Sequence, residues 1–335
     1  MKKTLLAIAV PAALFANAVS AVELYNDEVN TFAVGGHVSA GLTGSEEGDT
    51  EVESISPRLN IEATRDLGNG FVADAKAEWS LNMLDGGDNS FTTRLGYLGL
   101  THEAYGRTVV GTQWAPYYDA AGVADLPIAF ANDFLYADHG NIGTGRADKM
   151  VSYRNGLDFG EAGALSIGLG WQGAHSDTVG SITSYGQRSQ VALTYKVMDF
   201  SLNYAYNTGN VTFSGKQEDA TAQVLSASYG SYGNGLYVAG VYTQNEYVGD
   251  FEKTNNYEFL AAYALANSLN FSVNYEEQVD DKLDNAVYST SAVQVEYNFL
   301  SNVIGYAGYQ FDLGGDGIYD GTENNIWKFG GRIIF

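Results

Sequence analysis

The chain has 335 residues and no cysteine, and 40 acidic against 17 basic residues give it a net charge of −23. Without cysteine it can hold neither disulfides nor thiolate-bound metals, and its excess of carboxylates disfavours nucleic acid, whose phosphates bind lysine and arginine. The 40 glycines and 24 tyrosines, set against only four prolines, are typical of many strands joined by tight turns.

Residues 1–21 have the order of a secretory signal peptide. Lys2 and Lys3 precede an apolar run over 5–15, which is too short to span a bilayer, and small residues then lead to Ala21. We expect cleavage after Ala21, with Ala18 as the alternative, and a single mature domain over 22–335. Removing the two lysines of the leader leaves 15 basic and 40 acidic residues, a net charge of −25.

Polar and apolar residues alternate with a period of two through the mature chain. Over 71–82, one face is apolar from Phe71 to Leu81 and the other is polar from Asp74 to Asn82. A soluble sandwich alternates in the same way, but it turns its polar face outward, whereas a transmembrane barrel turns it toward the lumen. No apolar run past the leader is long enough for a membrane helix, so a membrane protein with this sequence would have to be a barrel. The pattern recurs over 32–42, 57–64, 200–206, 269–276 and 292–299.

Short and long connections alternate strictly between these segments. This rhythm favours an outer-membrane barrel with tight periplasmic turns and longer outer loops. The predicted fold class is all-β, a transmembrane antiparallel β-barrel of about 16 strands, a size that encloses an aqueous channel. The short links are predicted at 67–70, 102–106, 155–163, 196–199, 230–235, 264–268 and 300–302, and the long ones at 44–53, 83–90, 113–146, 173–186, 207–220, 245–256, 277–289 and 312–325.

Residues 113–146 form the longest interruption of the strand pattern. The segment carries two of the four prolines, many aromatic and small residues, and several aspartates. A loop of this length inside a compact fold usually has a function. Its small and aromatic residues can pack against a wall while its aspartates face water. We therefore predict that it folds into the barrel and narrows the lumen as a constriction loop.

The last segment, 326–335, is an amphipathic strand that ends on an aromatic residue. Trp327 and Phe329 share one face with Phe335, while Lys328 and Arg332 share the other. In a barrel, Phe335 would act as a signal for outer-membrane assembly, and tyrosines and tryptophans near strand ends would form interfacial girdles. The girdle residues predicted in this way are Tyr97, Tyr153, Trp171, Tyr195, Tyr206, Tyr229, Tyr275 and Tyr297.

Several segments resemble the general porins of Gram-negative bacteria, which are trimeric, non-specific diffusion channels. The resemblance is carried by VELYND at 22, PRLNIEATRDLGNG at 57, TTRLGYLGLTHEAYGRTVVG at 92, YYDAAGVADLPIAF at 117 and GRADKMVSYRNG at 145. The resemblance is strong up to about residue 156. Beyond that point it rests on the regular spacing of the strands and on the terminal Phe335. The segment that begins at Tyr117 resembles the third loop of the family, which constricts the pore.

The resemblance implies a pore constriction in which basic side chains on the wall face acidic groups on the loop. The matching wall residues are His37, Arg58, Arg94 and Arg146, and the matching loop acids are Asp125 and Asp133. Two positions depart from the enteric members. His37 stands where they commonly carry lysine, and Ile128 stands where they carry glutamate, without the glycine pair that follows. We therefore expect a weaker wall charge and a loop tip of different shape.

The predicted function is passive diffusion of ions and small hydrophilic solutes across the outer membrane, with a weak to moderate preference for cations. Fixed charges around a narrow waist tune ion preference, and an acidic mouth concentrates cations. A substrate-specific channel, a barrel enzyme and a plugged structural barrel remain alternatives. The predicted strand count and the long internal loop disfavour the enzyme, and the sequence contains no GxSxG or HExxH motif.

We expect no cofactor and no metal site. The four histidines, His37, His102, His139 and His175, lack the spacing of metal ligands, and the glycine-rich stretch at 314–320 resembles a calcium repeat only once and out of register. The expected partners are two further copies of the chain in a homotrimer, which the resemblance implies, together with outer-membrane lipid and lipopolysaccharide. No nucleic-acid partner is expected.

Overall fold

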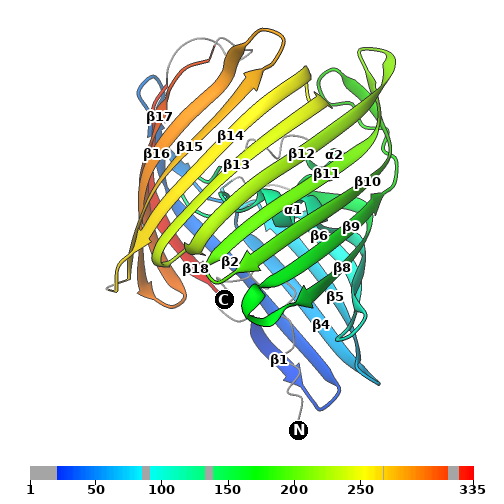
Figure 1. The fold of residues 1–335 in the computed structure, drawn as a ribbon. Helices are drawn as coiled ribbons and strands as arrows, with labels where there is room; N and C mark the ends of the chain where they lie inside the picture. The colour runs from blue at the N-terminus through cyan, green and yellow to red at the C-terminus, as the bar shows by residue number, and fades with distance from the viewer. Residues whose placement is uncertain (1–20, 85–90, 133–138, 267, 316–323) are drawn as a thin grey trace.

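A computed structural model describes residues 21–84, 91–132, 139–266, 268–315 and 324–335. The predicted leader lies outside the described residues except for Ala21, and so does Asp133 of the predicted constriction. Within these ranges the chain forms eighteen strands, of which sixteen close into an antiparallel barrel (Figure 1). The sixteen are β2 (Asn30–Ser45), β4 (Arg58–Gly68), β5 (Phe71–Leu81), β6 (Phe91–His102), β7 (Gly106–Trp114), β8 (Arg146–Asp158), β9 (Ala164–Gln172), β10 (Ile182–Val197), β11 (Phe200–Phe213), β12 (Lys216–Ser231), β13 (Asn234–Val248), β14 (Phe251–Ala264), β15 (Leu269–Asp280), β16 (Asn285–Leu300), β17 (Val303–Asp312) and β18 (Ile326–Ile334).

The barrel closes where β18 pairs with β2. Ile334 lies opposite His37, and the pairing runs up to Ile326 opposite Ser45. Two short strands complete the seam. The first, β1 (Val22–Asn26), pairs with the lower part of β2 beyond the end of β18, and β3 (Glu51–Glu53) pairs with its upper part beyond the start of β4. All the strand edges in the closed ring are therefore paired, which confirms the predicted fold class.

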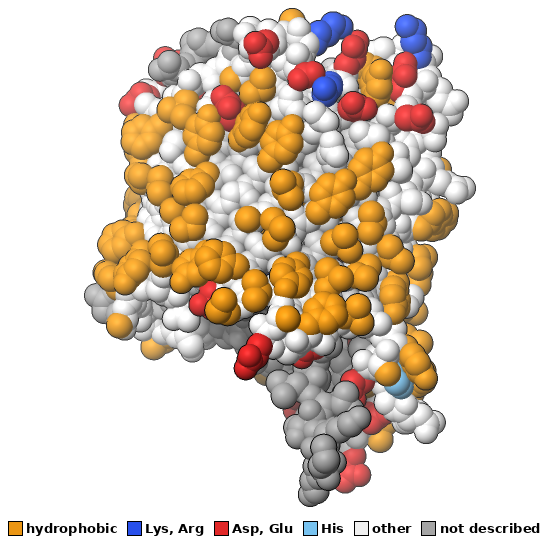
Figure 2. Space-filling model, viewed as in Figure 1, with side chains coloured by type: hydrophobic (Ala, Val, Ile, Leu, Met, Phe, Trp, Pro, Cys, Tyr) orange, Lys and Arg blue, Asp and Glu red, His pale blue; other side chains and the backbone are white. Residues whose placement is uncertain are grey.

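The two faces of the strands differ as a membrane barrel requires. On β10, Gln190, Ala192 and Thr194 are buried toward the inside, whereas Leu193 and Tyr195 are 38% and 39% exposed on the outside. Figure 2 shows hydrophobic side chains spread over the outer face, with charged ones confined to its rims. None of the helices among the described residues is long and apolar enough to cross a membrane.

Three of the predicted long loops are instead extended hairpins. The segment predicted as a link at 207–220 continues the pairing of β11 with β12 and turns only at Ser214 and Gly215. Both residues have positive φ, 47° and 80°, as a two-residue turn between twisted strands requires. Likewise, β13 and β14 meet at Gly249–Asp250, and β15 and β16 turn over 281–284. The prediction of long loops was wrong here because polar residues pair as strands when their hairpin extends beyond the apolar belt into water.

The side chain of Tyr97 lies inside the barrel, so its assignment to an interfacial girdle was wrong. Its neighbour Leu98 is 68% exposed on the outer face, which places Tyr97 on the opposite, lumen face of β6. The guanidinium of Arg107 lies 5.9 Å from the centre of the Tyr97 ring and pairs with Asp74. Tyr97 therefore belongs to a charged cluster in the lumen.

The long connection between β7 and β8 folds into the barrel. Its first part forms the six-residue helix α1 (Pro116–Ala121), which lies within the ring of strands in Figure 1, and its last part forms α2 (His139–Ile142). A 3-10 turn, η3 (Gly160–Ala162), closes the short link between β8 and β9. The predicted entry of this loop into the lumen is confirmed, and the loop defines the narrow waist of the channel.

Candidate functional site: the channel waist

Small side chains on the barrel wall form a seat for the constriction loop. Ala192, Ala205 and Ala222 project inward from β10, β11 and β12 and are buried against Tyr117 and Ala120 of the loop. Each alanine leaves room for the helix backbone to come close to the strand. The lumen face is therefore apolar where the loop covers it, and water is excluded between the loop and the wall.

Hydrogen bonds fix the first half of the loop in this seat. Ser226 Oγ donates to the Ala120 carbonyl at 2.6 Å, and Tyr237 Oη donates to the Val123 carbonyl at 2.7 Å. Gln190 holds both ends of the loop, because its Oε1 accepts from Tyr117 N at 2.7 Å and its Nε2 donates to the Gly143 carbonyl at 2.9 Å. These buried contacts satisfy backbone groups that a loop inside a barrel would otherwise leave unpaired.

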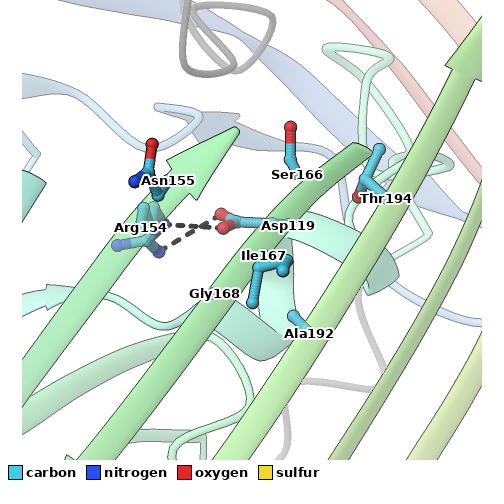
Figure 3. Close-up of a pocket in the computed structure, with 8 residues that line it drawn as sticks. All are labelled: Asp119, Arg154, Asn155, Ser166, Ile167, Gly168, Ala192 and Thr194. Atoms are coloured by element: carbon cyan, nitrogen blue, oxygen red, sulfur yellow. Dashed lines mark hydrogen bonds and ion pairs between the residues drawn. The ribbon is translucent and has the colours of Figure 1, made fainter. Parts of the chain in front are cut away.

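An ion pair anchors the start of the loop. Asp119 points from α1 toward Arg154 on β8, as Figure 3 shows, and its Oδ2 accepts from Arg154 Nε at 2.6 Å. Arg154 Nη2 also donates to Asp119 Oδ1 and to the Trp114 carbonyl. Both charges are largely buried, so the loss of either partner would leave an uncompensated charge. Neither residue belongs to the set predicted from the sequence.

The tip of the loop is fastened to the opposite wall. Ile128 N donates to Glu296 Oε1 on β16 at 2.8 Å, and Phe130 N donates to Gln294 Oε1 at 2.8 Å. Asn274 Nδ2 donates to the Phe130 carbonyl at 2.8 Å. Ile128 itself packs beside Ala129 and Phe130 instead of presenting a charge. The loop is thereby held at both ends and at its tip.

The predicted basic residues lie on β2, β4, β6 and β8, within one stretch of the channel wall. His37 on β2 is paired with Arg58 on β4. Arg94 lies on β6, and Arg146 begins β8, where its guanidinium lies 5.9 Å from the centre of the Trp114 ring. The charges of Arg58, Arg94 and Arg146 interact electrostatically with one another. The four side chains therefore form one ladder on the wall.

A β-bulge turns Arg94 into the lumen. Glu78 lies opposite Leu95 and Trp79 opposite Thr93, so Arg94 is the extra residue on its strand. Leu98 and Leu100 face outward on β6, and strict alternation from them would turn Arg94 outward as well. Because of the bulge, Arg94 Nε instead reaches Glu78 Oε1 at 2.8 Å inside the channel.

Besides Glu296, two charged residues of the waist were missing from the predicted set. Arg332 on β18 lies opposite Ser39 and interacts with His37 and Arg58 across the seam. Glu78 on β5 lies between two wall arginines, 2.8 Å from Arg94 Nε and 3.9 Å from Arg58 Nη1. Both residues stood on the polar faces of their predicted strands, and this signal could have identified them.

Asp125 is the predicted acidic group of the loop that lies within the described residues. It accepts a hydrogen bond from Tyr118 Oη at 2.7 Å and interacts electrostatically with Arg146. Burial, and then the Asp125 carboxylate, raise the pKa of Tyr118 well above its usual value. Tyr118 therefore stays a neutral donor to the Asp125 carboxylate. No group of three or more metal-ligating side chains occurs among the described residues.

The waist carries charges of both signs in the part of the chain that the structure describes. Arg58, Arg94, Arg146 and Arg332 provide four positive charges, and the three carboxylates that interact with them belong to Glu78, Asp125 and Glu296. The cations lie on the wall and Asp125 lies on the loop, so a field runs across the opening. Such a field favours polar and charged solutes over apolar ones.

Comparisons with known proteins agree with this architecture. A family model described as Gram-negative porin matches residues 4–317. Outer membrane protein F of Serratia marcescens is 25% identical over 93% of both chains, and outer membrane protein U of Vibrio parahaemolyticus is 28% identical over 93% of this chain and 90% of that protein.

Solved structures show the same fold. Salmonella typhi OmpF in complex with daunomycin has a TM-score of 0.80 and 22% identity, and it covers 94% of this chain and all of its own. An anion-selective porin from Comamonas acidovorans has a TM-score of 0.75 and 18% identity, with 91% of this chain and all of that chain covered.

Proposed function

Since this chain belongs to the Gram-negative porin family, whose members are non-enzymatic channels for small solutes in the outer membrane, we propose that its own channel prefers cations weakly to moderately. We assign the waist to His37, Arg58, Arg94 and Arg146 on the wall and to Asp125 on the loop. Asp133, which lies outside the described residues, is the second predicted acid of the loop.

The observation that carries this proposal is the contrast between the waist and the whole chain. The waist carries charges of both signs, whereas the chain without its predicted leader has a net charge of −25. Such an excess concentrates cations at the channel mouth. The four wall arginines oppose this effect locally, which is why the expected preference is modest.

The reversal potential in a planar bilayer under a KCl gradient tests the proposal. A cation-selective potential is expected near 0.1 M salt, and it should weaken toward 1 M, because the Debye length falls from about 10 Å to about 3 Å. An anion-selective potential at low salt would mean that the wall arginines dominate and that the proposed preference is wrong. Conductance itself reports the channel function independently of selectivity.

We further propose a homotrimer that forms through the early strands and β18. A trimer form is recorded for OmpT of Vibrio cholerae, which has a TM-score of 0.66 with this chain. On the proposed face, Leu98 and Val110 are 68% and 53% exposed on β6 and β7. Apolar side chains on the remaining outer face would contact membrane lipid, and the outer rim would contact lipopolysaccharide.

The leader and the assembly signal complete the proposal. Residues 1–21 would direct export and be removed, which N-terminal sequencing of the membrane protein tests directly. Phe335 exchanges backbone hydrogen bonds with Gly36 in both directions, at 2.9 and 3.0 Å. We propose that its aromatic side chain is also read during assembly, so that Phe335→Ser should lower the amount of folded barrel recovered from outer membranes.

A further inference from the structure

A cavity of about 270 Å³ lies between the tip of the constriction loop and the short turns at the periplasmic end of the barrel. Leu126 and Ile128 of the loop line it on one side. Tyr232 and Gly233, from the turn between β12 and β13, and Leu265, from the turn after β14, line it on another. Its volume is close to the lower end of the range for small-molecule sites, which begins at about 300 Å³.

One side of the cavity carries hydrogen-bond donors with positive charge. Arg332 and Arg58 both line it, together with His37. Arg332 Nη2 makes one long bond of 3.3 Å to the Ile55 carbonyl, and its buried Nε has no acceptor among the described residues. Arg58 uses Nε and Nη2 on Ser56, while its Nη1 is 3.9 Å from Glu78. A guanidinium has five donors, so both arginines retain donors for an anionic group such as a carboxylate.

Acceptors with negative charge lie on another side. Glu296 Oε1 accepts a hydrogen bond from Ile128 N, Oε2 accepts a long bond of 3.5 Å from Asn270 Nδ2, and the carboxylate also interacts with the Tyr232 hydroxyl. The Tyr232 hydroxyl is buried beside Glu296 and Asn270 and makes no hydrogen bond of normal geometry within the described residues. A carboxylate and a phenol with open acceptor positions suit an ammonium group.

The two charged sides are held apart by the barrel. Glu296 lies on β16 opposite Tyr306, and Arg332 lies on β18 opposite Ile304. The strands are therefore two positions apart, roughly 10 Å between backbones at the usual strand spacing. The two charges interact electrostatically, but no ion pair joins them in the described part of the chain. A small solute that carries both charges could join them.

We propose that this cavity binds small zwitterions with an apolar side chain, of the α-amino-acid class. The carboxylate is held by Arg332 and Arg58, and the ammonium by Glu296 and the Tyr232 hydroxyl. The apolar side chain of the bound solute packs against Leu126 and Ile128. A charged residue at this place in the loop tip would disfavour an apolar side chain. This inference rests on the proposed channel function and adds to it a preferred class of solute.

Interruptions of the single-channel current test the proposal, with leucine as the probe. Leucine is expected to produce brief, concentration-dependent blocks. Three analogues each remove one recognised feature: N-acetyl-leucine lacks the ammonium, leucine amide lacks the carboxylate, and glycine lacks the side chain. Loss of either charged group should shorten the blocks about tenfold, since the loss of one buried charged contact acts mainly on dissociation. Glycine should also shorten the blocks, because it makes no apolar contact with Leu126 and Ile128. Equal blocks from leucine and from all three analogues would overturn the proposal.

Matched variants locate the site. Arg332→Gln should shorten the leucine blocks about tenfold, whereas Lys328→Gln, which removes the same charge from the same strand outside the cavity, should leave them unchanged. A Tyr232→Phe variant keeps the shape of the turn. It should shorten the blocks by leucine, but not those by N-acetyl-leucine, which has no ammonium group. Open channels without leucine blocks would refute the site while leaving the channel function intact, and an absence of conductance would refute both.

Discussion

Arg58 and Arg65 lie on the same strand in different surroundings. Arg58 faces the waist, beside Glu78 and the other wall arginines. Arg65 lies exposed near the periplasmic end of β4, where Nη1 donates to Asn30 Oδ1 at 3.1 Å. Each arginine carries one positive charge, so its removal changes the net charge of the protein by the same amount. Comparing the two variants therefore separates a local effect at the waist from an effect of net charge.

We predict that Arg58→Gln increases cation selectivity and that Arg65→Gln does not. Removing one positive charge from a narrow opening changes the potential that each ion crosses, whereas a charge outside it is screened by salt. The reversal potential at 0.1 M KCl measures this difference. Equal shifts in the two variants would show that net charge, and not the wall ladder, sets selectivity.

Asp27 provides a prediction for pH dependence in the turn between β1 and β2. Hydrogen bonds from Tyr25 Oη at 2.6 Å, and from the backbone nitrogens of Asn30 and Val29, lower the pKa of this exposed carboxyl far below its usual value. A lowered pKa in the folded state adds stability above the usual pKa of aspartate, and this stability is lost as the pH falls through the folded value.

Hydrogen exchange of the Val29 and Asn30 amides checks this direction. Both amides should stay protected at a pH below the usual pKa of aspartate, about 3.9, and lose protection only at more acidic pH. In Asp27→Ala the protection should be weak at every pH. If the wild-type amides lose protection at the pH where an ordinary exposed aspartate becomes protonated, the hydrogen bonds of this turn do not lower the pKa of Asp27.

At the scale of elements, the constriction loop depends on the size of the residues beneath it. Ala222 on β12 is 1% exposed and packs under the loop, whereas Ala227 projects from the same strand to the outside. We predict that Ala222→Leu destabilises the loop seat by about 1–3 kcal/mol, the usual effect of overpacking. The loop should then move into the opening.

Conductance and current noise measure this displacement. Ala222→Leu should lower the conductance, because a displaced loop occupies more of the lumen. It should also increase the noise of the open-channel current, because the displaced loop fluctuates. Ala227→Leu is the matched control, since it adds the same atoms to the outer face and should leave both quantities unchanged. Identical currents from the two variants would contradict a loop held by wall packing.

At the scale of the whole molecule, two exposed leucines distinguish the trimer face from the lipid face. Leu98 on β6 lies on the proposed trimer face, and Leu225 on β12 is 51% exposed elsewhere on the barrel. We predict that Leu98→Arg converts trimers into monomers, because a charge buried between subunits lacks a partner.

Native mass spectrometry of the detergent-solubilised protein gives the oligomeric state. Leu225→Arg should reduce membrane insertion, at a cost of roughly 2–4 kcal/mol if it lies near the bilayer centre, yet leave the assembled protein trimeric. Trimers of Leu98→Arg alongside monomers of Leu225→Arg would reverse the assignment of the two faces.

The sequence by itself determined the barrel and its constriction loop. Side chains alternate across a strand with a period of two, so a membrane barrel leaves this period in its sequence. The same rule identified the polar faces that carry His37 and Arg58. The assignment of Tyr97 to a girdle was wrong because it rested on a position near a strand end, which does not reveal which face the side chain occupies.

Only the tertiary structure decided which residues meet. The bulge that turns Arg94 inward depends on the register of two strands, and a bulge leaves no reliable period in the sequence. Arg332 joins the waist because the barrel closes β18 against β2, at a separation of almost the whole chain. Glu296 reaches the loop tip for the same reason. Contacts of this kind depend on closure of the ring, which local sequence patterns cannot encode.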